Sequence, residues 1–414
     1  MGLRSRVKGT PVEDEVAGAA TTTPHLSETA AKATPAAAAV SAVSPSAEHV
    51  TGEPDPRHPL YLGDWARSIP HVHDDIAMDD LDEPHIKRKH AILDAHPDIK
   101  QLYGYEPLTK YVALVAASAQ FALAYYFGRI NTDSTWLFLL TIYVVGASFT
   151  QVFGVIIHEA THNLCGETLA INRAVGLLAN AGIPVPIFSS FRRYHLEHHA
   201  YQGVIGRDPD LPLDWEVKLI KSNPLAKFTF LFFYPLMYVV RGAAQQKRPS
   251  AWEIYNVIFS VLVDIVVVHT CGWRGLGYLF FSLWFGYGVH PAAAHFIQEH
   301  FTFDDGQETY SYYGCLNYLF MNIGYHNEHH DFTKVAWSKL PSIRAIAPEF
   351  YNTLGYHTSW VMVHVRFIFN KEVGPQSRVG RDYEDHKRGR KMVVEKKKNA
   401  CATAATAAVG SKME

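Results

Sequence analysis

Three short strings place histidines at spacings that suit metal binding. YHNEHHDF (325–332) and YHLEHHAY (194–201) both contain H-x-x-H-H, and IHEATHN (157–163) contains H-x-x-x-H. Two copies of H-x-x-H-H would arise by chance in well under roughly one chain in a hundred. Residues three and four apart share one face of a helix, so each string presents its imidazoles together. The candidate ligands are His158, His162, His195, His198, His199, His326, His329 and His330.

These imidazoles exceed what one metal ion needs, because a structural zinc site is complete with about four ligands. Imidazole binds zinc, copper, iron and nickel, so ligand type alone does not select the metal. The surplus of ligands beside membrane spans favours a non-haem di-iron centre that uses O₂. HPAAAHFIQEH, residues 290–300, adds three histidines. We expect His295 to be a ninth ligand, since the last span ends there, and His290 and His300 to be outer or ordinary polar residues.

Carboxylates adjoin the candidate ligands. They can accept the second ring proton of an imidazole and orient it, or they can be ordinary helix-surface groups. These residues are Glu159, Glu197, Glu299 and Glu328. Other histidines belong to no cluster, and among them we expect six to be surface or core residues: His71, His73, His85, His90, His357 and His364.

The elements that position the clusters are apolar segments of membrane-spanning length. A spanning helix needs about 20 mainly apolar residues. Residues 108–128 and 135–157 qualify and form one hairpin, and residues 252–270 and 275–296 form a second. The predicted fold is therefore an all-α membrane protein with four transmembrane helices in two hairpins, interfacial helices and a cytosolic histidine-rich cap.

Two further apolar stretches are too short and contain proline, namely residues 174–188 and 228–240. If all three histidine strings serve one site, they must lie on one side of the membrane. Four spans satisfy this condition, and counting one extra stretch as a span would break it. We therefore expect both stretches to be interfacial.

The distribution of basic residues predicts the orientation. The segments on the histidine side contain Arg192, Arg193, Lys218, Lys221, Lys227, Lys247 and Arg248. The two short opposite loops contain Arg129 and Arg274. The histidine side and both termini should therefore be cytosolic.

Composition separates the spans from polar ends. Residues 1–57 and 381–414 are expected to be disordered tails, around a cytosolic segment (58–107) and a membrane domain (108–380). No secretory signal is visible, and Arg6 stands where a myristoylation signal needs Ser or Thr. The four cysteines form no C-x-x-C pair, so neither a disulfide framework nor a thiolate zinc site is indicated. The near-zero net charge gives no reason to expect nucleic-acid binding.

With these motifs in view, the chain resembles the integral-membrane fatty acyl desaturase and hydroxylase superfamily, and more narrowly the sphingolipid Δ4-desaturases. The resemblance runs from about residue 73 to about 380 and includes all three histidine strings. It rests on PHIKRKHAILDAHPDIKQLYGYEP (84–107), FRRYHLEHHAYQG (191–203), GVHPAAAHFIQEHF (288–301) and GQETYSYYGCLNYLFMNIGYHNEHHDF (306–332).

The resemblance implies a reaction. Family members use two iron ions, O₂ and two electrons to introduce a trans double bond between carbons 4 and 5 of the sphinganine base of dihydroceramide, which gives ceramide. The electrons would come from NAD(P)H through cytochrome b5 reductase and a separate cytochrome b5. The location would be the endoplasmic reticulum membrane.

Three alternatives remain open from the sequence. The same scaffold can hydroxylate carbon 4, alone or together with desaturation. It can also act on an acyl-CoA or another acyl-lipid. A non-catalytic histidine-rich transporter or metal-binding protein would place polar groups along its spans, whereas here the span centres are nearly free of charge.

Overall fold

The computed structural model describes residues 84–304, 307–381, 383–384 and 386–387. The predicted N-terminal tail, the boundary at residue 57 and the N-terminal lipidation motif lie outside these residues, as does nearly all of the predicted C-terminal tail.

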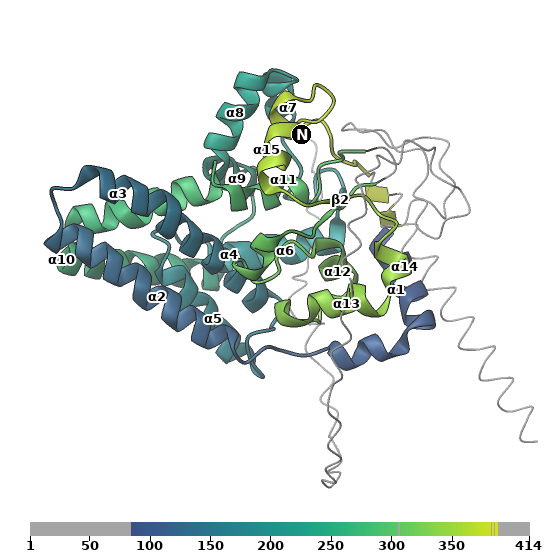
Figure 1. Cartoon of the computed structure of the whole chain (residues 1–414), viewed down its shortest axis with the longest axis horizontal. Helices are drawn as coiled ribbons and strands as arrows, with labels where there is room; N and C mark the ends of the chain where they lie inside the picture. The colour runs from purple at the N-terminus through teal and green to yellow at the C-terminus, as the bar shows by residue number, and fades with distance from the viewer. Residues whose placement is uncertain (1–83, 305–306, 382, 385, 388–414) are drawn as a thin grey trace, which may run out of the picture. The chain divides into compact units, whose positions relative to one another are not determined.

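Within the described residues, three helical runs are long and apolar enough to cross a membrane. The first joins α2 (Thr109–Tyr125) to the π-helical segment η3 (Tyr126–Ile130), and the second joins α3 (Thr135–Thr141) through η4 (Ile142–Gly146) to α4 (Ala147–Thr161). The third run is α10 (Ala251–Tyr287). They lie together in the left half of Figure 1, with the shorter helix α5 (Leu169–Ala181) packed beside α2 and α4. The first predicted hairpin therefore has the expected form.

The region of the second predicted hairpin forms one helical run, α10, with a break at Gly272. The backbone there has φ 75° and ψ 173°, a left-handed conformation that glycine adopts without the strain of a Cβ. The run ends at Tyr287, so the fourth predicted span, which extended to residue 296, was too long. Residues beyond it form the 3₁₀ turn η5 (Pro291–Ala294) and the short helix α11 (His295–Gln298).

The two halves of α10 return to the same end of the bundle. Near its start, Glu253 pairs with Arg193 of α6 at 3.1 Å. Near its end, the carbonyl of Gly286 accepts a hydrogen bond from Gln151 of α4. At the opposite end, Arg129 donates to the carbonyls just before Gly272. Both ends of α10 therefore lie on the side of the bundle that carries the histidines.

The two stretches predicted to be interfacial form helices too short to span. They contribute to α5 (Leu169–Ala181), α6 (Phe188–Tyr201), α8 (Pro224–Phe232) and α9 (Tyr234–Ala244). Asn180 accepts from the backbone amides of Ile187 and Phe188, which fixes the turn between α5 and α6. Leu225, Phe228, Leu236 and Val239 are exposed on α8 and α9, as expected for helices that lie along an apolar boundary.

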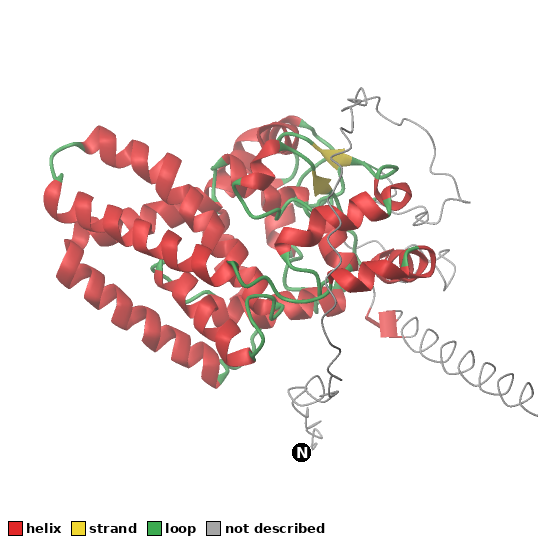
Figure 2. Ribbon diagram, turned by 60° about the horizontal axis from the view of Figure 1, so that its bottom comes forward, coloured by secondary structure: helices red, strands yellow, loops and turns green. Residues whose placement is uncertain are grey.

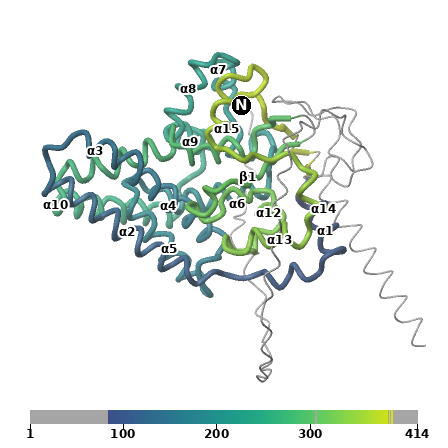
Figure 3. Tube along the Cα trace, in the orientation of Figure 1, coloured from purple at the N-terminus to yellow at the C-terminus, as the bar shows by residue number. Residues whose placement is uncertain are grey.

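Short elements build the remainder, on the right of Figures 1 and 2. These are α1 (Pro84–Ala95), η2 (Pro97–Leu102), α7 (Asp214–Ile220), β1 (Ser311–Tyr312), η6 (Cys315–Tyr318), α12 (His326–Asp331), η7 (Trp337–Lys339), α13 (Leu340–Ile346), α14 (Pro348–Tyr351), β2 (Tyr356–His357) and α15 (Trp360–Phe369). The strands β1 and β2 pair in parallel, a small departure from the all-α prediction. In the trace of Figure 3, α1 and α12, far apart in sequence, lie close together, and their residues contact one another.

Candidate metal centre

Three helices and one loop bring the histidines together. His158 and His162 lie at the C-terminal end of the long helix α4, and His195, His198 and His199 lie on α6. The short helix α12 carries His326, His329 and His330. Arg192 of α6 donates to the last carbonyls of α4, including that of Thr161, and so ties the two helices at the level of the histidines. The described segments meet where the membrane-length helices end.

Five of the predicted ligands form a first cluster. They are His158, His162, His195, His199 and His329, and their nearest ring nitrogens all lie within 4.8 Å of one another. The Nε2 atom of His195 is 3.0 Å from that of His162 and 3.0 Å from that of His199. The Nε2 atom of His199 is also 3.2 Å from that of His329. All three histidine strings therefore contribute to this cluster.

A second cluster surrounds His300. Its Nε2 atom lies 2.9 Å from Nε2 of His198 and 2.9 Å from Nε2 of His326. His198, His300 and His330 bring their ring nitrogens within 4.8 Å of one another. We call His198, His300, His326 and His330 the second cluster. His199 and His330 connect the two clusters, with ring centroids 4.2 Å apart.

The spacing of these nitrogens fits metal ions better than it fits hydrogen bonds. A neutral imidazole has one N–H, so Nε2 of His195 has at most one proton to share between its two close nitrogen neighbours. Metal–imidazole bonds of about 2.1 Å at a right angle put two ligand nitrogens about 3.0 Å apart. In addition, both ring nitrogens of His158 and Nε2 of His330 are buried without a hydrogen-bond partner. The donor set therefore suits two neighbouring metal ions.

Burial keeps most of these imidazoles neutral, which is the form that binds a metal. Burial and then the neighbouring imidazoles lower the pKa of His195, His199 and His329 well below the usual value, and the same holds for His330. His198 is the exception. Burial lowers its pKa, but the adjacent Asp208 carboxylate outweighs burial, and the net shift is upward.

Asp208 is an outer contact that the sequence analysis missed. Its Oδ1 atom lies 2.9 Å from Nδ1 of His198, and its Oδ2 atom accepts from the backbone amide of Gly203. A carboxylate on the far nitrogen fixes the tautomer and orientation of a ligating histidine. Asp208 lies ten residues after His198, beyond the spacings of three and four that place residues on one helix face, although the acidic string RDPD marks the place.

The four glutamates predicted beside the ligands have different partners. Glu299 is 2.6 Å from Nδ1 of His295 and 3.7 Å from Nδ1 of His326. Glu159 accepts from the backbone amide of Trp337, and its carboxylate is 3.6 Å from Nδ1 of His158.

The remaining two bond elsewhere. Glu328 accepts from Ser311 and Tyr313, and Glu197 pairs with Lys247. Of the four glutamates, Glu299 thus contacts an imidazole at hydrogen-bond distance.

His295 lies outside both clusters. Besides Glu299 on Nδ1, it has Gln151 on Nε2, at 3.2 Å from the amide oxygen. His290, expected to be an ordinary polar residue, accepts from the backbone amide of Ala292. The loop after α11 instead brings His300 into the second cluster, although the sequence analysis had given His300 an outer or ordinary polar role.

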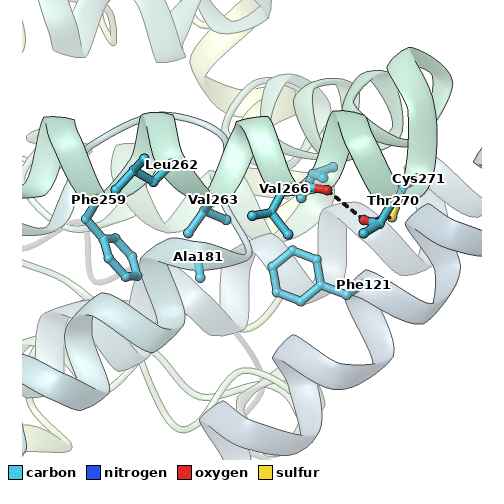
Figure 4. A pocket seen from close by; sticks show the side chains of 9 residues that line it. Phe121, Ala181, Phe259, Leu262, Val263, Val266, Thr270 and Cys271 are labelled. Atoms are coloured by element: carbon cyan, nitrogen blue, oxygen red, sulfur yellow. Dashed lines mark hydrogen bonds between the residues drawn. The ribbon is translucent and has the colours of Figure 1, made fainter.

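Two cavities are distinct in character. One, of about 430 Å³, has a mixed lining that includes His162, Tyr103, Glu167 and Lys334, so it adjoins the first cluster. The other, of about 520 Å³, is apolar and lies between α2, the end of α5 and the first half of α10. Figure 4 displays its wall of aliphatic and aromatic side chains. Because no histidine or carboxylate lines the apolar cavity, it is not a candidate metal site.

Comparison with known proteins identifies the family. The protein-family model described as fatty acid desaturase matches residues 134–361. The family model described as sphingolipid Δ4-desaturase matches residues 79–108. A protein of Oryza sativa subsp. japonica named sphingolipid delta(4)-desaturase DES1-like is 41% identical over 302 residues, covering 72% of this chain and 90% of that protein. The Schizosaccharomyces pombe protein named sphingolipid delta(4)-desaturase is 42% identical over 313 residues, covering 72% and 86%.

A Caenorhabditis elegans relative, provisionally named as a sphingolipid delta(4)-desaturase/C4-monooxygenase, is 36% identical over 312 residues, covering 74% of this chain and 85% of that protein. The family match spans more than half of the chain and includes both histidine clusters. The chain therefore belongs to the fatty acid desaturase family, in the group of the sphingolipid Δ4-desaturases.

Proposed function

We propose that the protein is a sphingolipid Δ4-desaturase, which introduces a trans double bond between carbons 4 and 5 of the sphinganine base of dihydroceramide and yields ceramide. The observation that carries this proposal is the assembly of two adjoining histidine clusters in a chain whose relatives are named for this activity. The enzyme is an oxidoreductase, and O₂ would be the oxidant.

Nine histidines would hold two iron ions. The first cluster supplies His158, His162, His195, His199 and His329, and the second supplies His198, His300, His326 and His330. This set has His300 in place of His295. When bound, the iron ions would supply the O₂ chemistry that removes two hydrogens from an unactivated methylene pair.

The chain's own residues would orient these ligands and keep water away. Asp208 holds His198 in one tautomer. Arg192 donates to the carbonyl of Thr161 and so fixes the C-terminal end of α4. The second cluster is almost fully buried, which limits the access of water to the reacting carbons. Since a misplacement of about 1 Å can cost about a hundredfold in rate, regioselectivity depends on such rigid support.

We further propose four crossings of the endoplasmic reticulum membrane, two of them by the halves of α10, with the histidine side facing the cytosol. Support comes from the return of both ends of α10 to the histidine side and from the basic residues there. Electrons would reach this side from NAD(P)H through cytochrome b5 reductase and cytochrome b5. A transporter is disfavoured, because the histidines gather at the end of the spans instead of along them.

Hydroxylation at carbon 4 is the second candidate activity, alone or combined with desaturation. The observation in its favour is the paired name of the Caenorhabditis elegans relative. Both reactions begin with removal of the same hydrogen and diverge at the next step. An acyl-lipid or acyl-CoA desaturase has less support, because the relatives described above are named for sphingolipids.

A product assay tests the proposal. The chain is expressed in a yeast that lacks Δ4 double bonds in its long-chain bases, and ceramides are read by mass spectrometry with cytochrome b5 co-expressed. The expected product is two mass units lighter, with the double bond between carbons 4 and 5. Extra 4-hydroxylated base alone would move the assignment to a hydroxylase. Unchanged sphingolipids would refute both activities, provided that a known desaturase is active in the same strain.

A further inference from the structure

The N-terminal helix α1 reaches the third histidine string through one buried carboxylate. Asp331 follows His330 directly and is fully buried. Its Oδ1 atom accepts from Nδ1 of His85 at 2.8 Å. Its Oδ2 atom accepts from Nε of Arg88 at 2.5 Å and from the hydroxyl of Tyr351 at 2.8 Å. Two of these three donors belong to α1.

The same two side chains of α1 make further contacts around α12. The Arg88 guanidinium also donates to the side-chain oxygen of Asn327, at 2.8 Å, so it bonds both ends of the turn that carries His329 and His330. Nε2 of His85 lies at hydrogen-bond distance, 3.0 Å, from the hydroxyl oxygen of Thr309. The His85 ring lies 4.8 Å from the ring of His330, between centroids. These contacts fix α12 in position and in rotation about its axis.

Apolar packing supports this contact. Ile92 of α1 and Ile99 of η2 are fully buried in one core with Phe332, Val335 and Tyr351. Helix α12 is short, at six residues, and an isolated helix of that length is not stable in water. Its conformation therefore depends on what packs and bonds around it.

The position of these residues in the chain adds a second observation. The match to the fatty acid desaturase model begins at residue 134, after α1. The match to the sphingolipid Δ4-desaturase model, residues 79–108, contains His85 and Arg88. The part of the chain that is characteristic of this group thus supplies the donors to Asp331.

We propose that His85 and Arg88 are positioning residues of the metal centre: through Asp331 they hold α12 so that His326 and His330 complete the second cluster. The inference rests on the proposed function, since it presumes that the clusters bind iron. It extends that function to a segment outside the histidine strings. Neither residue touches the substrate or the metal in this proposal, and each acts through the carboxylate.

The test compares metal release with stability. Wild type, Arg88→Gln and Arg241→Gln are purified in mild detergent, loaded with Fe²⁺ without O₂ and diluted into a chelator. Arg241, on α9, is the matched control. It is as buried as Arg88, and its Nε atom donates to Oε2 of the buried Glu216 at 3.0 Å. We expect Arg88→Gln to release iron about 10–100-fold faster than Arg241→Gln, the range typical for outer partners of metal ligands. The midpoint temperature of thermal unfolding, measured without metal, should fall by a similar amount in both variants.

A second pair of variants, at His85, tests the same point if Arg88→Gln does not fold. The amide nitrogen of asparagine can replace Nδ1 of His85, so His85→Asn keeps the donor to Asp331, whereas His85→Gln lacks a donor at that place. Iron release should stay near wild type in His85→Asn and accelerate in His85→Gln. Equal release from Arg88→Gln and Arg241→Gln, or from the two His85 variants, would overturn the inference. A wild-type chain that binds no iron would instead refute the metal centre of the proposed function, and the inference with it.

Discussion

Two single exchanges separate the competing ninth ligands, His300→Gln and His295→Gln. His300 stands in the middle of the second cluster, 2.9 Å from a ring nitrogen on either side. His295 is engaged on both ring nitrogens by Glu299 and Gln151. Glutamine keeps the polarity of either site but provides an amide instead of an imidazole, and an amide is a poorer ligand for iron.

The expected magnitudes differ in kind. His300→Gln leaves the second cluster with three imidazoles, so we expect its ion to be lost first and the protein to retain about one iron per chain instead of about two. His295→Gln removes an outer contact, with an expected cost of 10–100-fold in affinity, or about 1.4–2.7 kcal/mol. At saturating iron its stoichiometry should therefore stay at about two.

The assay is iron per chain by elemental analysis, on detergent-purified protein after passage through a desalting column. His269→Gln, on the opposite side of the bundle, is a control for the general effect of losing a histidine, because that residue lies beside the Gly272 break. One iron in His295→Gln and two in His300→Gln would refute the assignment of the second cluster. Equal stoichiometry in all variants would refute the role of His300 as a ligand.

Three further perturbations test the packing and the electrostatics. A Cβ at Gly128 would lie 1.8 Å from a backbone oxygen, so Gly128→Ala should lower the free energy of unfolding by about 1–3 kcal/mol or more. Less monodisperse protein should then appear in size-exclusion chromatography. The control Gly277→Ala, where the added Cβ meets open space, should not have this effect. Tyr313→Phe leaves the buried Glu328 without one of its donors, and should lower stability by about 1–3 kcal/mol in detergent unfolding; an unchanged midpoint would contradict this. Burial, aided by the charge of a nearby arginine, lowers the pKa of His357 to about 3. The unfolded chain gains a proton there below about pH 6.5 and the folded chain does not, so stability should fall from pH 6.5 toward pH 3, less steeply in His357→Phe; identical slopes would refute this.

The histidine strings were predictable because their spacing is local. His158 and His162, or His326, His329 and His330, lie within one or two helical turns, so the helical period alone brings each set to one face. The first hairpin followed from apolar length in the same way. The condition that all three strings serve one site led to the prediction that two short apolar stretches do not span, and the helices that they form are too short to cross a membrane.

The remaining features depend on contacts between distant segments. His295 and His300 are five residues apart, and which one enters the second cluster is decided by the turn after α11, which no local pattern specifies. His85 was expected to be a surface or core residue and is buried beside His330, 245 positions away in the chain. Asp208 likewise meets His198 through a loop closure. Periodicity carries no information about such pairings.

The two turns at the far end of the bundle have a consequence for how the protein meets the compartment across the membrane. Residues 131–134 join one pair of helices, and Gly272 alone separates the halves of α10. If the bundle spans the bilayer in the proposed orientation, only the short loop 131–134 and the break at Gly272 face the lumen among the described residues, so a lumenal protein, a glycan or a protease has little chain to contact there. Every signal that adjusts the enzyme through its described residues must then arrive from the histidine side or through the lipid itself.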